Sequence, residues 1–376
     1  MKKNKKQFSI LIPEVDSNLL LFVINCLSQI KEFKLFVIVN KPFEEIKYSR
    51  NISHYTYYPK FSDETKWLSS IEKEVNEHNI DIVMPINEYG IQTLIKHKNN
   101  ISYASKLVLL PSIESFIISN NKGLLWKHMI TYKIPCPDTF LYNKNEFHSE
   151  NLLEYPLLIK PLEGFGGGEG IHIFKNKEEL NNYYSSNKNK YPYLIQNYID
   201  GYDIDCSVLC ENGEVISYTI QKGILFGEHA FAPKAGLEFL YEPDLLEVVK
   251  DLMKTLNWSG VAHIDLRFDN KDKKFKVIEI NPRFWRSVEA SEIAGVNFPY
   301  LYILKSLNEE FEIPKYKEIK YLDLLGLKKM IKKNIFFLFN TRFILNNTPI
   351  KYYLKDPIPF AYMFYYKLKN MFSFRF

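Results

Sequence analysis

Residues 155–174 have the sequence YPLLIKPLEGFGGGEGIHIF, in which an apolar strand ends at Lys160 and a glycine-rich loop follows. Five glycines lie within seven residues: Gly164, Gly166, Gly167, Gly168 and Gly170. Glycines let backbone N–H groups close over phosphate oxygens, and a lysine adds a point charge for the same phosphates. The lysine precedes the glycines here, whereas it follows them in a Walker loop and in a protein kinase. This order predicts a different type of nucleotide-phosphate site, with a mobile surface hairpin as the alternative.

A second polar cluster is predicted in residues 263–287, HIDLRFDNKDKKFKVIEINPRFWRS. Glu279 and Asn281 lie two apart on one strand, so they share a face at a separation of about 6.5 Å, and a tight hairpin can bring Asp265 to that face. Carboxylate and amide oxygens are ligands that Mg²⁺ prefers. Arg283 can reach a transferred phosphoryl group or a substrate carboxylate with two hydrogen bonds. The alternative is an exposed hairpin with ordinary surface charges.

Weaker signals lie around these two clusters. Backbone groups of Gln196, Asn197 and Ile199 can hydrogen-bond the edge of an adenine ring, and Asp203 can accept from ribose hydroxyls. Taken alone, however, this segment is better explained as a plain strand and turn. Lys122 begins a helix, whose N-terminus favours anions, but a lysine there is usually solvated.

The segment after the 214–221 strand also carries charged residues. Lys234 is a candidate for a nucleotide phosphate, and Lys222, Glu228 and His229 are candidates for the side of the second substrate. For His229 a solvated loop residue is the simpler interpretation.

The order of the predicted elements indicates two kinds of sheet. In the N-terminal part, apolar strands alternate with helical stretches, which predicts an α/β domain with a parallel sheet; the strands are 8–12, 34–39 and 81–86, and the helices 18–30 and 64–78. The first glycine of the chain is Gly90, so the glycine-rich turn of a dinucleotide site is missing.

The later part of the chain predicts an α+β fold of mainly antiparallel strands. The expected strands are 107–110, 157–160, 171–174, 193–198, 204–210, 214–221, 261–268 and 275–280. The expected helices are 113–132, 176–186 and 243–256.

In chain order these pieces resemble the ATP-grasp superfamily, and most closely its carbamoyl-phosphate-synthase-like, carboxylate–amine ligase branch. The resemblance covers residues 80–305. It is carried by Asn121-Lys122, by KIPCP at 133–137, by Lys160-Pro161 with the glycine loop, by the hinge Gln196–Ile199, and by EINPR at 279–283.

The resemblance implies roles for these residues. Lys122 and Lys160 would hold ATP phosphates between two lobes, and Arg283 would stabilise an acyl phosphate. Three glycines, Gly166, Gly167 and Gly168, would cover the phosphates; Gln196, Asn197, Ile199 and Asp203 would hold the nucleoside; and Asp265, Glu279 and Asn281 would ligate Mg²⁺, with Mn²⁺ as an alternative.

The implied activity is an ATP- and Mg²⁺-dependent ligase that joins a small carboxylate to an amine or another nucleophile through an acyl phosphate, forming a C–N bond. Two alternatives stay open: a phosphoryl transferase that stops at the phosphorylated carboxylate, and an ATP-binding regulatory protein with the same fold. Product analysis separates the three.

Four segments are expected: a pre-ATP-grasp α/β domain (1–112), a small lobe with the glycine loop (113–192), a large lobe with the metal site (193–310) and a helical extension (311–376). The extension is basic and aromatic, and the favoured interpretation is helices that cap the ligase core. Contact with a membrane surface or a partner is the less favoured alternative.

Composition fits an ordinary soluble globular protein, which we expect to be cytoplasmic. The chain has 376 residues, 46% hydrophobic residues and a net charge of +5, a mild excess that does not indicate nucleic acid binding. No apolar run reaches the roughly 18 residues needed to span a membrane, and the N-terminus lacks the clean apolar stretch of a signal peptide. A homo-oligomer is compatible with the sequence.

Overall fold

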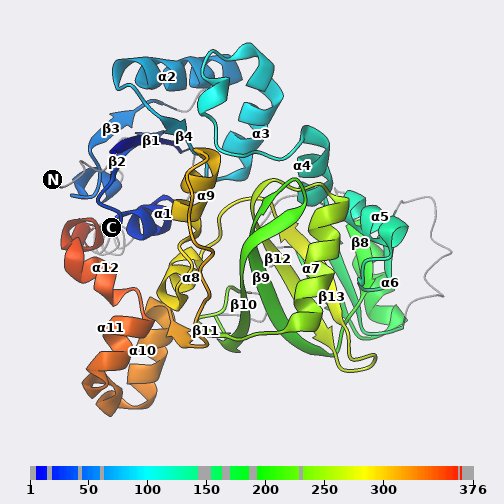
Figure 1. The fold of residues 1–376 in the computed structure, drawn as a ribbon. Helices are drawn as coiled ribbons and strands as arrows, with labels where there is room; N and C mark the ends of the chain where they lie inside the picture. Colours follow the sequence, from blue (N-terminus) through cyan, green and yellow to red (C-terminus); the bar gives the residue numbers. More distant parts are fainter. Residues whose placement is uncertain are drawn as a thin grey trace, which may run out of the picture. The chain divides into compact units, whose positions relative to one another are not determined.

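The computed structural model describes residues 6–14, 19–40, 45–59, 63–142, 154–162, 170–185, 193–227, 232–362 and 365. Contacts divide the chain into two compact units (Figure 1): residues 1–113, 259–261 and 283–376 form the first, and residues 114–258 and 262–282 form the second. The four segments expected from sequence remain a proposal about functional organisation.

The first unit is built on a parallel sheet, as the sequence predicted. Its strands are β1 (Phe8–Pro13), β2 (Phe33–Val39), β3 (His54–Tyr57) and β4 (Ile82–Val83), in the order β3-β2-β1-β4. The runs FSILIP and FKLFVIV are almost continuously buried, which is typical of parallel strands covered on both faces. The sequence missed β3, because its residues HYTY are half-exposed at the sheet edge and lack an apolar run.

Helices cover both faces of this sheet. α2 (Glu64–Glu77) packs Trp67, Ile71 and Val75 into a core with Leu11 and Phe36 of the strands. Figure 1 shows α1 (Leu20–Leu27) on the opposite side of the sheet. The other helices of this region are α3 (Glu88–His97) and the short 3-10 helices η1 (Glu45–Tyr48), η2 (Lys98–Asn100) and η3 (Ala104–Lys106). The expected strand at 107–110 is only a bridge between Leu107 and Val83.

The C-terminal part of the first unit is helical, as expected. Its elements are α8 (Val288–Ala294), α9 (Phe298–Ser306), β14 (Lys320–Leu322), α10 (Leu324–Lys333), η5 (Ile335–Phe339), α11 (Thr341–Asn347) and α12 (Ile350–Lys355). The amide of Asn51 donates to Asp356, just after α12, at 3.0 Å. The amide of Asn25 donates to the buried carboxyl of Glu289 at 2.6 Å. Both contacts tie the C-terminal helices to the N-terminal part of the unit.

The second unit contains a small antiparallel sheet. Its strands are β5 (Thr139–Tyr142), β8 (Tyr193–Asn197), β6 (Leu157–Pro161) and β7 (His172–Phe174), in the order β5-β8-β6-β7. α6 (Lys177–Ser185) inserts Leu180 into the core beneath it. The expected helix 113–132 is two helices, α4 (Ile113–Asn120) and α5 (Lys122–Tyr132), because Asn121 caps α5 by accepting from the N–H groups of Gly123 and Leu124.

A larger antiparallel sheet completes the second unit. Within this unit the strands lie in the order β13-β12-β9-β10-β11: β9 (Gly201–Glu211), β10 (Glu214–Leu225), β11 (Gly236–Phe239), β12 (Gly260–Asp269) and β13 (Phe275–Asn281). The sequence Glu211-Asn212-Gly213 between two apolar stretches predicts a hairpin turn. The structure confirms it, since Asn212 and Gly213 both have positive φ between β9 and β10. α7 (Pro243–Thr255) also belongs to this unit and buries Leu245, Val249 and Leu252.

Candidate active site

The β12–β13 hairpin places two carboxylates side by side. In its register Asp265 pairs with Glu279 and His263 pairs with Asn281. Directly opposite residues of an antiparallel pair project to the same face. The amide of Asn281 donates to Asp265 at 3.3 Å. The hairpin thus gathers the three residues that the sequence selected as metal ligands.

The neighbouring Asp265 makes ionisation of Glu279 less favourable. Burial raises the pKa of Glu279, and the negative charge of Asp265 and a hydrogen bond to it raise it further. Lys122 and Lys160 oppose this shift. Lys122, at the start of α5, has its Nζ 3.1 Å from Glu279 Oε2. The hairpin therefore holds excess negative charge against cations from other elements of the same unit.

Lys160 is the next-to-last residue of β6, and its side chain is buried. The residue is 3% exposed. Burial lowers the pKa of Lys160 to about 8, while the charges of Glu279 and Asp265 raise it and that of Lys122 lowers it. These mutual effects show that Lys160, Lys122 and the hairpin carboxylates lie close enough to interact, although they come from three separate elements.

A row of buried polar groups supports Asp265, and the sequence analysis missed it. His263 lies with Nε2 3.2 Å from Asp265 and hydrogen-bonds Ser207 through Nδ1 at 2.9 Å. Gln221 on β10 donates to Ser207 at 3.0 Å. The row fixes the imidazole and, through it, the orientation of the Asp265 carboxylate.

Asp205 is a further carboxylate that the sequence analysis overlooked. Its pKa lies well above the ordinary value, first because of burial and then because of the charges of Asp265 and Asp203. Ligand atoms of Asp205, His263 and Asp265 all lie within 4.8 Å of one another. Alternation along β9 was the available signal, since side chains two apart on a strand share a face: Asp203, Asp205 and Ser207.

Asp203 and Lys234 contact each other. The Nζ of Lys234 lies 2.8 Å from Asp203 Oδ2, and Arg267 makes a close ion pair with the other oxygen. Arg267 was not selected from the sequence. A Cβ on Gly223 would lie 2.6 Å from Lys234 Cγ, so the lysine passes directly over this glycine.

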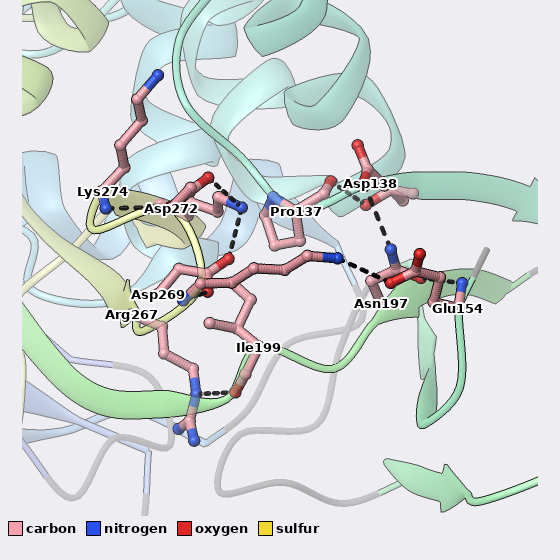
Figure 2. Close-up of polar contacts among 12 residues, drawn as sticks. Pro137, Asp138, Glu154, Asn197, Ile199, Arg267, Asp269, Asp272 and Lys274 are labelled. Carbon is pink, nitrogen blue, oxygen red and sulfur yellow. Dashed lines mark hydrogen bonds and ion pairs between the residues drawn. The ribbon is translucent and has the colours of Figure 1, made fainter. Parts of the chain in front are cut away.

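The hinge after β8 is held by side chains of the same unit (Figure 2). Arg267 donates from Nε to the carbonyl of Ile199 at 2.8 Å. Asn197 donates to Asp138 at 3.4 Å and accepts from the N–H of Glu154 at 3.2 Å. These contacts shape the backbone that was expected to meet adenine.

Gln196 uses its side chain inside the small sheet. The residue is buried, and its Nε2 donates to Thr139 Oγ1 at 2.8 Å. Its backbone pairs with Leu158 and Thr139. Gln196 is thus fixed between β5 and β6.

The remaining selected residues fall into two groups, one outside the described residues and one within them. Gly164, Gly166, Gly167 and Gly168, as well as Glu228 and His229, lie outside the described residues. Gly170, which follows the loop, has φ +77°. Arg283 belongs to the first unit, where its Nε donates to Glu88 at 2.5 Å. The Nζ of Lys222 lies 3.5 Å from the centroid of the Tyr202 ring.

Comparison with known families agrees with this arrangement. Residues 119–287, which include the lysines, the hinge and the acidic hairpin, match the ATP-grasp domain. By this match, residues 119–287 form an ATP-grasp domain.

Solved structures share the fold of this protein over most of its length. N5-carboxyaminoimidazole synthetase from Staphylococcus aureus, in complex with ADP, aligns with a TM-score of 0.69 at 15% identity over 89% of this chain and 87% of that chain. L-amino acid ligase from Bacillus licheniformis aligns with a TM-score of 0.60 at 19% identity over 83% and 76%. The biotin carboxylase domain of 2-oxoglutarate carboxylase from Hydrogenobacter thermophilus, with MgADP and bicarbonate, aligns with a TM-score of 0.62 at 18% identity over 81% and 70%.

Proposed function

We propose that this ATP-grasp protein is an ATP- and Mg²⁺-dependent ligase that joins a small carboxylate to an amine or another nucleophile. The observation that carries the proposal is the cluster in the second unit, where Lys122 and Lys160 interact with the paired carboxylates Asp265 and Glu279. The named activities of the aligned proteins, an amino acid ligase and a synthetase crystallised with ADP, agree with it.

The charges of this cluster match a magnesium nucleotide. Lys122 now neutralises Glu279 directly, and Lys160 is buried against both carboxylates. A nucleotide triphosphate supplies anionic oxygens for the lysines, and its Mg²⁺ supplies positive charge for the carboxylates. Binding therefore exchanges internal ion pairs for ligand contacts without leaving a buried charge uncompensated.

The residues present fit a hard divalent ion. Asp265, Glu279 and Asn281 offer oxygens from adjacent strands, and the raised pKa of Glu279 shows that this hairpin carries more negative charge than its burial favours. A Mg²⁺ ion held by these three residues would relieve that repulsion and would neutralise negative charge on the nucleotide phosphates. Mn²⁺ would take the same ligands.

The proposed reaction proceeds in two transfers. An oxygen of the substrate carboxylate attacks the γ-phosphorus, and the bond to the bridging oxygen of ADP breaks. The acyl carbon of the resulting acyl phosphate is then attacked by the amine, which loses a proton while inorganic phosphate leaves. Lys160 and Lys122 would stabilise the charge on the transferred phosphoryl group, and Arg283 would stabilise the acyl phosphate.

The other assignments rest on the positions of these residues in the ATP-grasp sequence pattern. Gly166, Gly167 and Gly168 would cover the phosphates and exclude water, and the hinge backbone at Gln196, Asn197 and Ile199 would meet adenine. Asp203 would bind the ribose, and Lys234 a phosphate. Because Asp203 and Lys234 are paired, nucleotide binding would have to open or share this ion pair.

The test is substrate-dependent ADP release over a panel of amino acids, other small carboxylates and amines. We expect Lys160→Ala and Glu279→Ala to lower turnover by at least about a hundredfold. The control is Lys127→Ala, an exposed lysine on α5 outside the cluster, which should keep wild-type turnover. Wild-type activity in the first two variants would refute the assignment. A stable phosphorylated product would indicate a phosphoryl transferase, and nucleotide binding without turnover a regulatory protein.

A further inference from the structure

The short helix η5 presents an apolar surface to solvent. Ile335, Phe336, Leu338 and Phe339 are 59%, 72%, 46% and 79% exposed. Single exposed apolar residues are common, but contiguous apolar patches on a protein surface usually mark a binding surface. Four large side chains within five residues form such a patch, here called the η5 patch.

Local contacts hold the patch in this conformation. Asn334 caps η5 by accepting from the N–H of Phe336 at 3.0 Å, and Asn340 caps α11 by accepting from the N–H of Phe343 at 3.3 Å. The rings of Phe337 and Phe343 pack edge to face with centroids 5.5 Å apart. Phe337 therefore anchors the turn, while its four apolar neighbours stay exposed.

The chain segment around the η5 patch carries one sign of charge. Residues 324–355 contain seven Lys or Arg and no Asp or Glu. Lys328, Lys332 and Lys333 of α10 are exposed next to the patch, and Arg342 of α11 is exposed after it. Figure 1 shows these helices in orange. A basic rim around exposed aromatic and aliphatic side chains is complementary to an anionic, partly apolar surface.

A cavity lined by basic residues, here called the hollow, lies beside α11. Lys317, Arg342, Phe343 and Lys351 line a cavity of about 610 Å³, and Lys351 also pairs with Glu292 at 2.7 Å. Arg342 and Phe343 therefore link the hollow to the η5 patch, since Phe343 packs on Phe337. The hollow offers cationic groups to a phosphate or carboxylate.

We propose that this region docks on the surface of an anionic lipid bilayer. The apolar residues of the η5 patch enter the interface, the lysines of α10 contact headgroups, and the hollow receives one headgroup. No described helix has the length and apolarity needed to span a membrane, so the contact is peripheral. A second copy of the chain fits less well, because a two-fold contact through this face would bring like charges together.

The sequence favours capping helices over this role. That interpretation expects the aromatic residues of the extension to be covered. The structure instead leaves Ile335, Phe336, Leu338 and Phe339 exposed, and this exposure is the observation that favours the lipid surface. The proposal does not depend on the ligase assignment, because vesicle binding needs neither ATP nor a carboxylate.

The experiment is co-sedimentation of the full chain with vesicles of phosphatidylcholine alone or with 30% phosphatidylglycerol, at two salt concentrations. We expect binding only to the anionic vesicles and weaker binding at the higher salt concentration. Phe336→Ser with Phe339→Ser should lower the partition coefficient at least tenfold. Ile313→Ser should not, although Ile313 is an apolar residue outside the patch that is 62% exposed. Each lysine near an anionic membrane surface raises the partition coefficient about fivefold. Lys332→Gln with Lys333→Gln should therefore lower the partition coefficient about 25-fold. The exposed pair Lys31→Gln with Lys34→Gln is its control.

A spectroscopic measurement tests insertion directly. In Phe336→Trp, we expect indole fluorescence that brominated lipids quench, and no such added quenching in Ile313→Trp. Absence of binding to anionic vesicles, or equal binding by the Phe336→Ser, Phe339→Ser variant, would overturn the proposal. So would a dimer in sedimentation equilibrium that this double variant dissociates, since the patch would then be a contact between copies.

Discussion

The amine of Lys122 lies 3.1 Å from the carboxylate of Glu279, although 156 positions separate them in the chain. One residue begins helix α5 and the other lies on strand β13. The contact joins a cation suited to phosphate with a carboxylate suited to metal, and it does so where burial has already raised the pKa of Glu279. Predictions about this site start from that pair.

Replacing Glu279 should uncouple metal from nucleotide. In the wild type, MgADP should raise the thermal midpoint more than ADP alone, because Mg²⁺ neutralises Asp265 and Glu279. In Glu279→Gln this added stabilisation by Mg²⁺ should disappear. For scale, a ligand present at 100 times its Kd stabilises the folded state by about 2.7 kcal/mol. Differential scanning fluorimetry with ADP, MgADP and Mg²⁺ alone measures it. Glu238→Gln, on β11, serves as the control. An unchanged Mg²⁺ increment would remove Glu279 from the metal site.

Nucleotide binding should weaken as pH rises through about 8. The pKa of Lys160 falls to about 8 because of burial, so the unliganded site loses this positive charge above that pH. Phosphates restore the charged form, so binding at pH 8.5 should take up a proton. Calorimetry in buffers of different ionisation enthalpy measures this uptake, which Lys160→Met should lack. Proton uptake that persists in Lys160→Met would assign the titration to another group.

The same lysine should make folding stability depend on pH. Its folded pKa lies below the unfolded value of about 10.4, so the unfolded chain binds more protons between pH 8 and 10.4, and stability should rise across that window. Below pH 8 the buried charge costs about 3 kcal/mol. Urea unfolding should therefore find Lys160→Met more stable than wild type at pH 7, with the difference shrinking towards pH 10. A constant difference would contradict the buried charge.

Gly223→Ala should disturb Lys234 without unfolding the protein. The new Cβ would lie 2.6 Å from Lys234 Cγ, so the flexible side chain must leave its position over β10 and its contact with Asp203. If Lys234 binds a nucleotide phosphate, ATP affinity should fall roughly tenfold, about as in Lys234→Met. Equilibrium binding with a fluorescent nucleotide measures this. Unchanged affinity in both variants would exclude Lys234 from the site.

Gly201→Ala should destabilise the second unit. A Cβ at this position would lie 1.7 Å from the carbonyl oxygen of Phe268, and this contact is with backbone, so β9 and β12 would have to separate. We expect a loss of roughly 3 kcal/mol in urea unfolding. In Gly123→Ala the nearest atoms are ends of side chains at 3.2 Å, so the change should stay within about 1 kcal/mol. Similar effects at both positions would contradict this account.

Much of the fold followed from local sequence. Runs such as FKLFVIV predicted the parallel sheet, and the signal at Glu211-Asn212-Gly213 predicted the β9–β10 hairpin. These signals are local because apolar runs and turn residues act within a few positions. The edge strand β3 and the break at Asn121 were missed, since edge exposure and capping depend on what packs nearby.

The sequence by itself determined which chemical groups the site contains: a lysine before a glycine loop, and a hairpin with Asp265, Glu279 and Asn281. The tertiary structure alone decided which of them meet. It brought Lys122 to Glu279, recruited His263 and Asp205 beside Asp265, and left the η5 patch exposed. The physical reason is that spacing along a strand fixes which face a side chain shares. The pairing of distant strands and the covering of a helix depend instead on packing between elements far apart in the chain.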